Sequence, residues 1–590
     1  MKYLVLMLAY SFFSLSTYAV GLEKVDDWDQ NMTQTKKKQV RIHQRQDEKN
    51  RRKELRKKYP NARFYINASR RNIGLSVGGA KDIDNFLSNI KHGYIPKMDS
   101  LTYEGIFYQH FFDTGIKQEC KSLFCPSYSH AIKKDIYTDE KYYYLSVGLN
   151  SGIKESDFKR KKLNLVVVLD ISGSMGATFN RYYYDTHTNA PQIDDNKSKM
   201  QIASESLVGM MNHLKDDDRF GVVLFDSTVN PVKPLRKVKK TDMGAIKKHI
   251  LDLHEKGGTN WSAGYREAMH YFDGIKPEEG VENRIIFITD AMPNSGELRK
   301  YRLFGMVKSA SKKGINTTFI GVGVDFNTNL VHYVSKVRGA NYYSVHSSSE
   351  FKKRMDKEFE FMVTPLVYDL ELKVTSRGYK IDAVYGSPDA NLTTGSIMKV
   401  NTLFPSASTE DKVKGGIVLL RLKKTGSSED IKLSVKYKDI HGKQYNNIQR
   451  THFDRSTPFY NNNGIRKAIL LSEYVTLVKN WMLDERAGCN DSVKYHYTKV
   501  TTIKKHCMVY PPMRSCYHQI NTWERKSCKL YVSDGYHKIF SLFKRHYESD
   551  QKVLKDKSLS MELKVLDRLI KAKEESIYNK LHGSVENWRK

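Results

Sequence analysis

The chain has 590 residues, enough for about three to four domains of average size. A hydrophobic content of 39% with 11% aromatic residues indicates a folded protein and excludes a disordered one. The formal net charge of +32 is interpreted first as a solvated, lysine-rich surface, and attraction to an anionic surface or glycan is the alternative. No basic motif with interleaved aromatic residues is present, so we expect no specific nucleic-acid binding.

The first residues, 1–19, have the pattern of a secretory signal peptide, with one early lysine, an apolar run and the small residue Ala19. The run is short for a membrane span, and we expect no transmembrane segment after cleavage. The sequence therefore predicts a secreted, extracellular protein, or one of the periplasm or cell envelope if the source is bacterial. Residues 20–62 are densely charged and are expected to form a disordered or helical arm.

Residues 63–160 are interpreted as an N-terminal extension that packs on the next domain. "DIDNFLSNIKHGYIP" has apolar residues at helical spacing before Pro96, which predicts a helix. "YEGIFYQHFF" and "KYYYLSVGL" have the composition of strands.

From residue 161 to 363 the pattern becomes a regular alternation of strands and helices. The strands, such as "LNLVVVLD" and "ENRIIFITD", are apolar throughout, which is typical of a mostly parallel sheet covered by helices on both faces. In such α/β folds, ligands bind beyond the carboxyl ends of the strands. Asp170 and Asp290 both lie at such ends.

Residues 364–450 show a period of two with turn signals, which predicts a small β-sandwich. Residues 451–590 are expected to form a helical C-terminal region. Its first helix has an apolar stripe that predicts core or inter-domain packing, made of Ile465, Ile469, Leu470, Val475, Val478 and Met482.

The six cysteines fall into two groups. Cys120 and Cys125 are close neighbours, and the C-terminal region carries the other four, Cys489, Cys507, Cys516 and Cys528. With an export signal, two local groups of disulfides are the natural interpretation. A zinc site is the alternative, but no paired C-x-x-C spacing is present. The pairing within the second group stays open.

Three predicted loops carry oxygen-bearing side chains at one edge of the sheet. Asp170, Ser172 and Ser174 follow the first strand, Thr259 follows two glycines, and Asp290 ends a later strand. Oxygen ligands of this kind suit a hard divalent cation. The sequence lacks a G-x-S-x-G nucleophile elbow, a Walker-type phosphate loop and an H-E-x-x-H zinc helix. We therefore expect a protein that is not an enzyme.

These residues, D-x-S-x-S in "LDISGSMGATF", the threonine of "KGGTNWSAG" and the aspartate of "FITDAMPNSG", resemble the metal-ion-dependent adhesion site of von Willebrand factor type A domains. The resemblance covers roughly residues 162 to 363 and implies a Rossmann-like fold. It implies that the two serines and the threonine bind Mg²⁺ directly and the aspartates mostly through water, with Mn²⁺ or Ca²⁺ as substitutes. It also implies a protein ligand that presents an acidic residue to the metal. Ala291 departs from the glycine that is frequent in the family and should affect the shape of the loop.

The domain layout also resembles that of bacterial envelope proteins with a von Willebrand A domain and an N-terminal extension. Residues 177 to 197 form a long insertion that should lie beside the metal. Its Tyr182, Tyr183 and Tyr184 are candidates for contact with the ligand, and a loop without a dominant contact is the alternative. Two functions follow: adhesion or protein interaction through the metal, or a structural protein of the envelope or matrix in which the metal mainly stabilises the fold.

Overall fold

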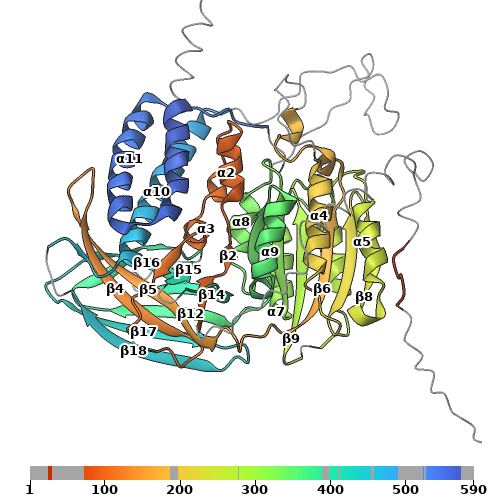
Figure 1. The fold of residues 1–590 in the computed structure, drawn as a ribbon, viewed down its shortest axis with the longest axis horizontal. Helices are drawn as coiled ribbons and strands as arrows, with labels where there is room; N and C mark the ends of the chain where they lie inside the picture. The colour runs from red at the N-terminus through yellow and green to blue at the C-terminus, as the bar shows by residue number, and fades with distance from the viewer. Residues whose placement is uncertain are drawn as a thin grey trace, which may run out of the picture.

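Two large sheets organise the protein, each with its own helices (Figure 1). The computed structural model describes residues 24–29, 72–117, 119–185, 197–276, 278–388, 397–409, 412–453, 457–489, 523 and 526–572. The predicted signal peptide and most of the charged arm lie outside these residues.

The first sheet has seven strands and forms the centre of the α/β domain. Its strands lie in the order β2 (Gly79–Ala80), β11 (Asn341–Val345), β10 (Ile315–Val322), β9 (Val281–Thr289), β6 (Lys162–Asp170), β7 (Arg219–Phe225) and β8 (Val229–Lys237). All neighbours pair in parallel except β8, which is antiparallel to β7 and forms one edge. This confirms the predicted Rossmann-like architecture.

Helices cover both faces of this sheet, because successive side chains of a strand point to opposite faces. On one face Leu165 and Val167 of β6 pack with α4 (Lys199–Met211), α5 (Met243–Leu251) and α9 (Ser348–Met362). On the other face Val166 and Val168 pack with α6 (Trp261–His270), α7 (Lys300–Lys312) and α8 (Asn329–Val334). The apolar run of β6 is explained by burial on both sides.

The second sheet is antiparallel and has ten strands. Eight lie in the order β13 (Tyr379–Tyr385), β16 (Ile417–Lys424), β5 (Lys141–Lys154), β1 (Asn72–Val77), β14 (Ile397–Ser406), β12 (Val367–Thr375), β17 (Asp430–Lys438) and β18 (Gln444–His452). The other two are β4 (Cys125–Lys134), which pairs with β5, and β19 (Phe459–Tyr460), which pairs with β4. A separate two-stranded sheet joins β3 (Phe111–Asp113) to β15 (Lys412–Lys414).

Strands from the predicted extension and from the predicted sandwich share this second sheet. β1 pairs with β14, and β5 pairs with β16, so residues before and after the α/β domain form one unit. The division at residues 160 and 364 therefore does not separate two sheets. The alternation of apolar residues predicted β14 and β16, but it carries no information on pairing with segments more than 200 residues away along the chain.

The extension also contacts the α/β domain directly. After β1 the chain enters the first sheet as β2, which pairs with β11. The helix α2 (Asp84–Lys91) follows, and its Asn89 donates a hydrogen bond to the carbonyl of Val324 at 2.9 Å. Arg354 of α9 forms ion pairs with Asp82 at 2.8 Å and Asp84 at 3.1 Å. These contacts hold the closing helix of the α/β domain against the extension.

One element of the extension differs from its prediction. "YEGIFYQHFF" is not a strand throughout: it forms helix α3 (Tyr103–Tyr108) and then the short strand β3. The hydroxyl of Thr102 accepts a hydrogen bond from the backbone N–H of Gly105 at 2.9 Å and caps the helix. This cap gives the segment a helical start that strand composition alone did not reveal.

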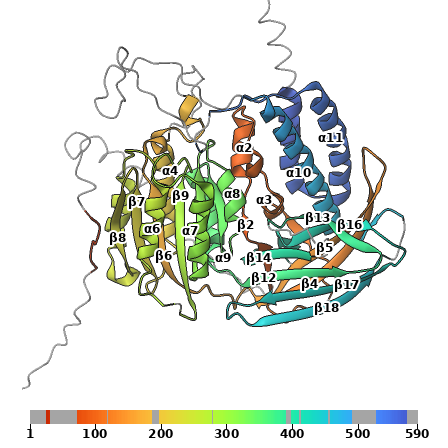
Figure 2. The ribbon, with the colours of Figure 1, turned by 180° about the vertical axis from the view of Figure 1, so that it is seen from behind.

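The described part of the C-terminal region is mainly helical. Helix α10 (Asn463–Ala487) lies beside α11 (Asp534–Leu554) over the ten-stranded sheet, and residues 560–572 are also helical (Figures 1 and 2). The apolar stripe of α10 is fully buried, with no member more than 1% exposed. It packs against α11, α3 and strands of the second sheet, which confirms its role in the core.

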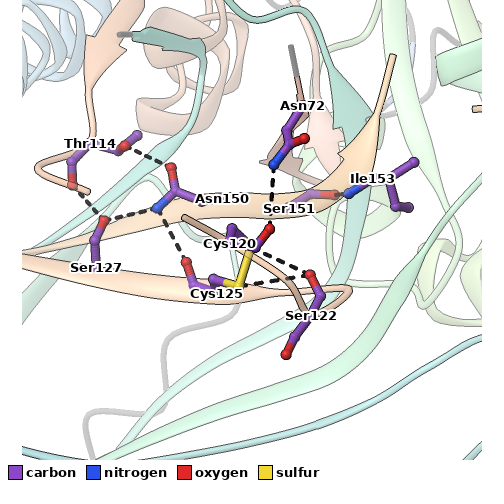
Figure 3. Close-up of a disulfide and its surroundings, with 9 residues drawn as sticks. All are labelled: Asn72, Thr114, Cys120, Ser122, Cys125, Ser127, Asn150, Ser151 and Ile153. Atoms are coloured by element: carbon purple, nitrogen blue, oxygen red, sulfur yellow. Dashed lines mark hydrogen bonds between the residues drawn. A yellow bond between two sulfur atoms is a disulfide. The ribbon is translucent and has the colours of Figure 1, made fainter. Parts of the chain in front are cut away.

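Two disulfides occur among the described residues, Cys120–Cys125 and Cys489–Cys528. The first closes the loop before β4 (Figure 3). Asn150 of β5 donates hydrogen bonds to the carbonyl of Cys125 at 3.2 Å and to the hydroxyl of Ser127 at 2.9 Å, so the loop is held to the sheet. Cys507 and Cys516 lie outside the described residues.

The described part of the chain contains no candidate membrane span. None of the described helices combines the length and the apolar composition that a membrane span requires.

Candidate metal centre

The structure places all five predicted metal ligands at the carboxyl edge of the seven-stranded sheet. Asp170 ends β6, and Ser172 and Ser174 lie in the 3₁₀ turn that follows it. Thr259 precedes α6, and Asp290 directly follows β9. All five are buried, with exposures of 0% for Asp170, Ser172 and Asp290, 1% for Thr259 and 8% for Ser174.

Backbone hydrogen bonds join the three loops to one another. The N–H of Gly173 donates to the carbonyl of Gly257 at 3.0 Å, which links the first loop to the second. The N–H of Asn294 donates to the carbonyl of Thr259 at 3.1 Å, and the side chain of Asn294 accepts from the N–H of Thr259 at 2.8 Å. The hydroxyls and carboxylates are therefore carried on a rigid, mutually supported frame.

The third loop turns sharply at Ala291. Its φ is +55°, a left-handed conformation that favours glycine. The predicted effect of Ala291 on the shape of this loop thus has a physical basis. The turn is supported by Thr289, whose hydroxyl accepts from the N–H of Ala291 at 2.9 Å and donates to Asp170 at 2.7 Å. Thr289 thus joins the first and third loops.

The donor set fits a hard cation. The hydroxyls of Ser172 and Ser174 lie 3.1 Å apart, and one carboxylate oxygen of Asp290, Oδ1, is buried without a hydrogen-bond partner in the part of the chain that the structure describes. A buried unpaired carboxylate oxygen is costly, which a cation would relieve. No group of three His, Cys, Asp or Glu side chains suited to a metal occurs among the described residues.

Electrostatics support the same interpretation. Burial, and then the neighbouring carboxylate of Asp290, raise the pKa of Asp170 to about 7, against the hydrogen bonds from Ser172 and Thr289. Two carboxylates with little solvent repel each other, and a positive charge between the loops would remove this penalty.

A buried lysine that the sequence analysis missed supplies part of that charge. Lys199, the first residue of α4, is 0% exposed, and its ammonium lies 3.0 Å from Oδ2 of Asp290 and 2.7 Å from Oδ1 of Asp325. Burial opposes the charge on Lys199, but the two carboxylates raise its pKa. Lys199 thus holds one oxygen of Asp290 and leaves the other unpaired.

Two signals in the sequence could have found this pair. A lysine in the first turn of a helix lies at the positive end of the helix dipole, which is unfavourable unless an acidic group compensates it. Asp325 follows β10, so it is a further aspartate beyond the carboxyl end of a strand.

A second missed residue comes from the C-terminal region. Trp523 is 2% exposed and lines a small apolar cavity next to the metal loops. The other lining residues are Trp261, Ala291, Pro293, Leu303, Phe304 and Leu330. Its indole N–H donates to the carbonyl of Leu298 at 2.9 Å. Its carbonyl accepts from the side chain of Asn327 at 3.0 Å, and the N–H of Asn327 donates to the carbonyl of Asp290 at 3.2 Å. Trp523 therefore supports the loop that carries Asp290.

The tyrosines of the insertion have different environments. Tyr182 is only 3% exposed, donates a hydrogen bond to Asn89 of α2 at 2.9 Å and packs edge-on against Tyr94. It is an internal contact with the extension, so its predicted contact with a ligand is not supported. Tyr183 is partly exposed, and its N–H donates to Asp325 at 3.0 Å, which places it beside the metal loops. The side chain of Tyr184 lies outside the described residues.

The raised pKa of Asp170 predicts a pH dependence of stability. The folded state binds this proton more tightly than the unfolded state, so in EDTA the free energy of unfolding should fall as pH rises from about 4 to about 7. Asp170→Asn should remove about 2–4 kcal/mol of this loss. Urea unfolding of both proteins at pH 5 and pH 8 measures it. An equal pH dependence in the two proteins would contradict the assigned pKa.

The fold and the loops define the class of this domain. Residues 164–357 match the family model of the von Willebrand factor type A domain, and the chain therefore contains such a domain. Mouse inter-alpha-trypsin inhibitor heavy chain H2 is 22% identical over 214 residues, which are 35% of this chain and 20% of the relative. The uncharacterized protein YfbK of Escherichia coli is 26% identical over 236 residues, 38% of this chain and 36% of the relative.

The similarity is confined to part of each protein. The chain covers about a fifth of the full length of heavy chain H2. Among solved structures, a von Willebrand factor type A protein from Catenulispora acidiphila aligns with a TM-score of 0.40 and 13% identity, over 64% of this chain and 84% of that one.

Proposed function

We propose that this chain is an exported protein that binds a protein ligand through a Mg²⁺-dependent site made by Asp170, Ser172, Ser174, Thr259 and Asp290. When bound, the cation would supply an open coordination position for an acidic side chain of the ligand. The observation that carries the proposal is the buried, unpaired oxygen of Asp290 on loops that also present three hydroxyls. Mn²⁺ or Ca²⁺ are possible substitutes.

The residues of the proposed metal site have different roles. The serines and Thr259 offer neutral oxygens, and Asp170 and Asp290 provide the negative charge. Lys199 and Thr289 orient one oxygen each of these two aspartates. Tyr183, beside the loops, remains a candidate for ligand contact, as does Tyr184, whose side chain lies outside the described residues. The net charge of +32 also supports contact with anionic surfaces, which we expect to be weaker than the metal-dependent contact.

Asp170→Ala should abolish saturable binding of Mn²⁺, used as the probe for the site, and should abolish EDTA-sensitive capture of the ligand. The control is Asp252→Ala, which removes an exposed aspartate at the end of α5. Isothermal titration with Mn²⁺ measures the first effect, and elution by EDTA from immobilised protein measures the second. Equal Mn²⁺ binding by the Asp170→Ala and Asp252→Ala variants would contradict the proposal.

The alternative function is structural, with the metal mainly stabilising the fold. It is distinguished by unfolding in EDTA. If EDTA releases the ligand while the free energy of unfolding changes little, the metal serves binding. If EDTA unfolds the domain at the same concentration that releases the ligand, the structural role is favoured.

A further inference from the structure

A short segment near the N-terminus docks on the far edge of the α/β domain. Residues 24–29 lie along β8, within the stretch that the sequence predicts to be a disordered or helical arm. The N–H of Asp29 donates to the carbonyl of Val232 at 2.8 Å. Val25 bridges to Thr241, and its carbonyl accepts from the N–H of Asp242 at 2.9 Å. Backbone hydrogen bonds at both ends thus hold the segment to β8 and to the turn that follows it, without making it a strand of the sheet.

Trp28 anchors this segment. Its side chain is 4% exposed and joins the core between the sheet and α5. The indole stacks on the ring of His249, with centroids 5.5 Å apart and planes 12° from parallel. A buried aromatic side chain in a pocket is the typical dominant contact of a peptide ligand.

Charge complementarity surrounds the anchor. Asp26 lies 2.8 Å from Nε2 of His249, and Asp27 lies 3.4 Å from the ammonium of Lys233 and 3.5 Å from the guanidinium of Arg236. The segment "VDDWD" is acidic, whereas β8 and the turn after it read "VNPVKPLRKVKK". We call the surface made by Val232, Lys233, Arg236, Thr241 and His249 the β8 site.

Several features distinguish the docked segment from an ordinary core strand. It is six residues long, and residues 30–71 separate it from β1, a length of 42 residues. A chain of 42 residues can span at most roughly 140 Å. This length allows the segment to reach the β8 site of its own copy or that of a second copy. The indole N–H of Trp28 has no hydrogen-bond partner among the described residues, which weakens the docking. The segment therefore has the properties of a tethered ligand.

We propose that the β8 site is a peptide-binding site separate from the metal loops. Its ligand is an extended, acidic segment with a central tryptophan, filled here by the chain's own residues 24–29, and its partner is the same segment of a second copy. Exchange of this segment between two copies would join them without any new surface. The metal site, at the carboxyl edge of the sheet, takes no part in this contact.

The test uses the full chain with Trp28→Ala as the receptor and a synthetic peptide of residues 22–31 as the probe. The peptide should bind this receptor, equally in Mg²⁺ and in EDTA, with a 1:1 stoichiometry by calorimetry. The same peptide with Trp28→Ala should bind about 30-fold more weakly, because a buried anchor contributes about 2 kcal/mol or more. A receptor that also carries Arg236→Glu should bind the original peptide more weakly, because it repels Asp27.

The second arm measures mass by light scattering across a concentration series. The wild-type chain should show a dimer that grows with concentration, and the Trp28→Ala chain should remain monomeric. Failure of the peptide to bind, equal binding of both peptides, or a monomer at all concentrations of the wild type would overturn the proposal. A Trp28→Ala chain that no longer folds would also overturn it, by showing that Trp28 is an indispensable part of the core. Loss of binding in EDTA would place the peptide at the metal loops instead.

Discussion

Replacement of Lys199 by methionine is expected to destabilise the protein by about 3–5 kcal/mol in EDTA, because it leaves two buried carboxylates without their cation. Asp290 and Asp325 are both fully buried at 0% and 1% exposure, and the ammonium of Lys199 lies within 3.0 Å of each. Methionine keeps most of the length and the apolar stem of the side chain, so the main effect is loss of the charge. Urea unfolding in EDTA measures it.

The same variant should recover part of this stability in Mg²⁺, because a cation at the metal loops offsets the uncompensated charge of the buried Asp290. The matched control is Lys197→Met. Lys197 lies two residues away and pairs with Glu205 at 2.8 Å, but its side chain is 44% exposed. Its loss should cost less than about 1 kcal/mol and should not depend on Mg²⁺. Similar losses for the two variants would show that the buried ion pairs of Lys199 with Asp290 and Asp325 contribute little to stability.

Replacement of Trp523 by alanine is expected to cost about 3–5 kcal/mol of stability and to weaken Mn²⁺ binding about tenfold. The stability term comes from the cavity that a removed indole leaves against Trp261, Leu303 and Phe304. The binding term comes from Ala291 and Pro293, which lie on the same wall and belong to the loop of Asp290. Thermal unfolding and Mn²⁺ titration measure the two effects separately.

Two further variants separate the contributions of Trp523. Trp523→Phe keeps an aromatic ring but loses the hydrogen bond to Leu298 and part of the ring volume, so it should cost about 1–2 kcal/mol and preserve most Mn²⁺ binding. Tyr301→Ala removes an aromatic side chain of α7 that is 66% exposed, and should change stability by less than about 0.5 kcal/mol. Unchanged Mn²⁺ affinity in Trp523→Ala would show that Trp523 supports the fold but not the metal loops.

The predicted site and the missed residues differ in how local their signals are. Asp170, Ser172 and Ser174 lie within five residues, and Asp290 ends an apolar strand, so a short pattern reveals them. Lys199, Asp325 and Trp523 reach the same loops from three separate segments. Their contacts depend on how helices and the C-terminal region pack, and a single sequence records no such distances.

For the tyrosine insertion, the sequence predicts the position of the loop but not the exposure of its side chains. Its position beside the metal loops follows from the order of the elements, and the bond from Tyr183 to Asp325 agrees with it. Whether each ring faces solvent depends on α2, a helix some 90 residues earlier, whose Asn89 holds the hydroxyl of Tyr182. Exposure was therefore beyond what composition could indicate.

The sequence by itself determined the α/β class, several strands of the second sheet and the oxygen-bearing loops, because each depends on residue period or on neighbours along the chain. The tertiary structure alone decided that β1 and β5 join β14 and β16 in one sheet, and that Lys199 neutralises Asp290. It also decided that Trp28 packs into the core beside β8 and against His249 of α5. These contacts join distant segments, and their free energy comes from burial and charge pairing that exist only once the chain is folded.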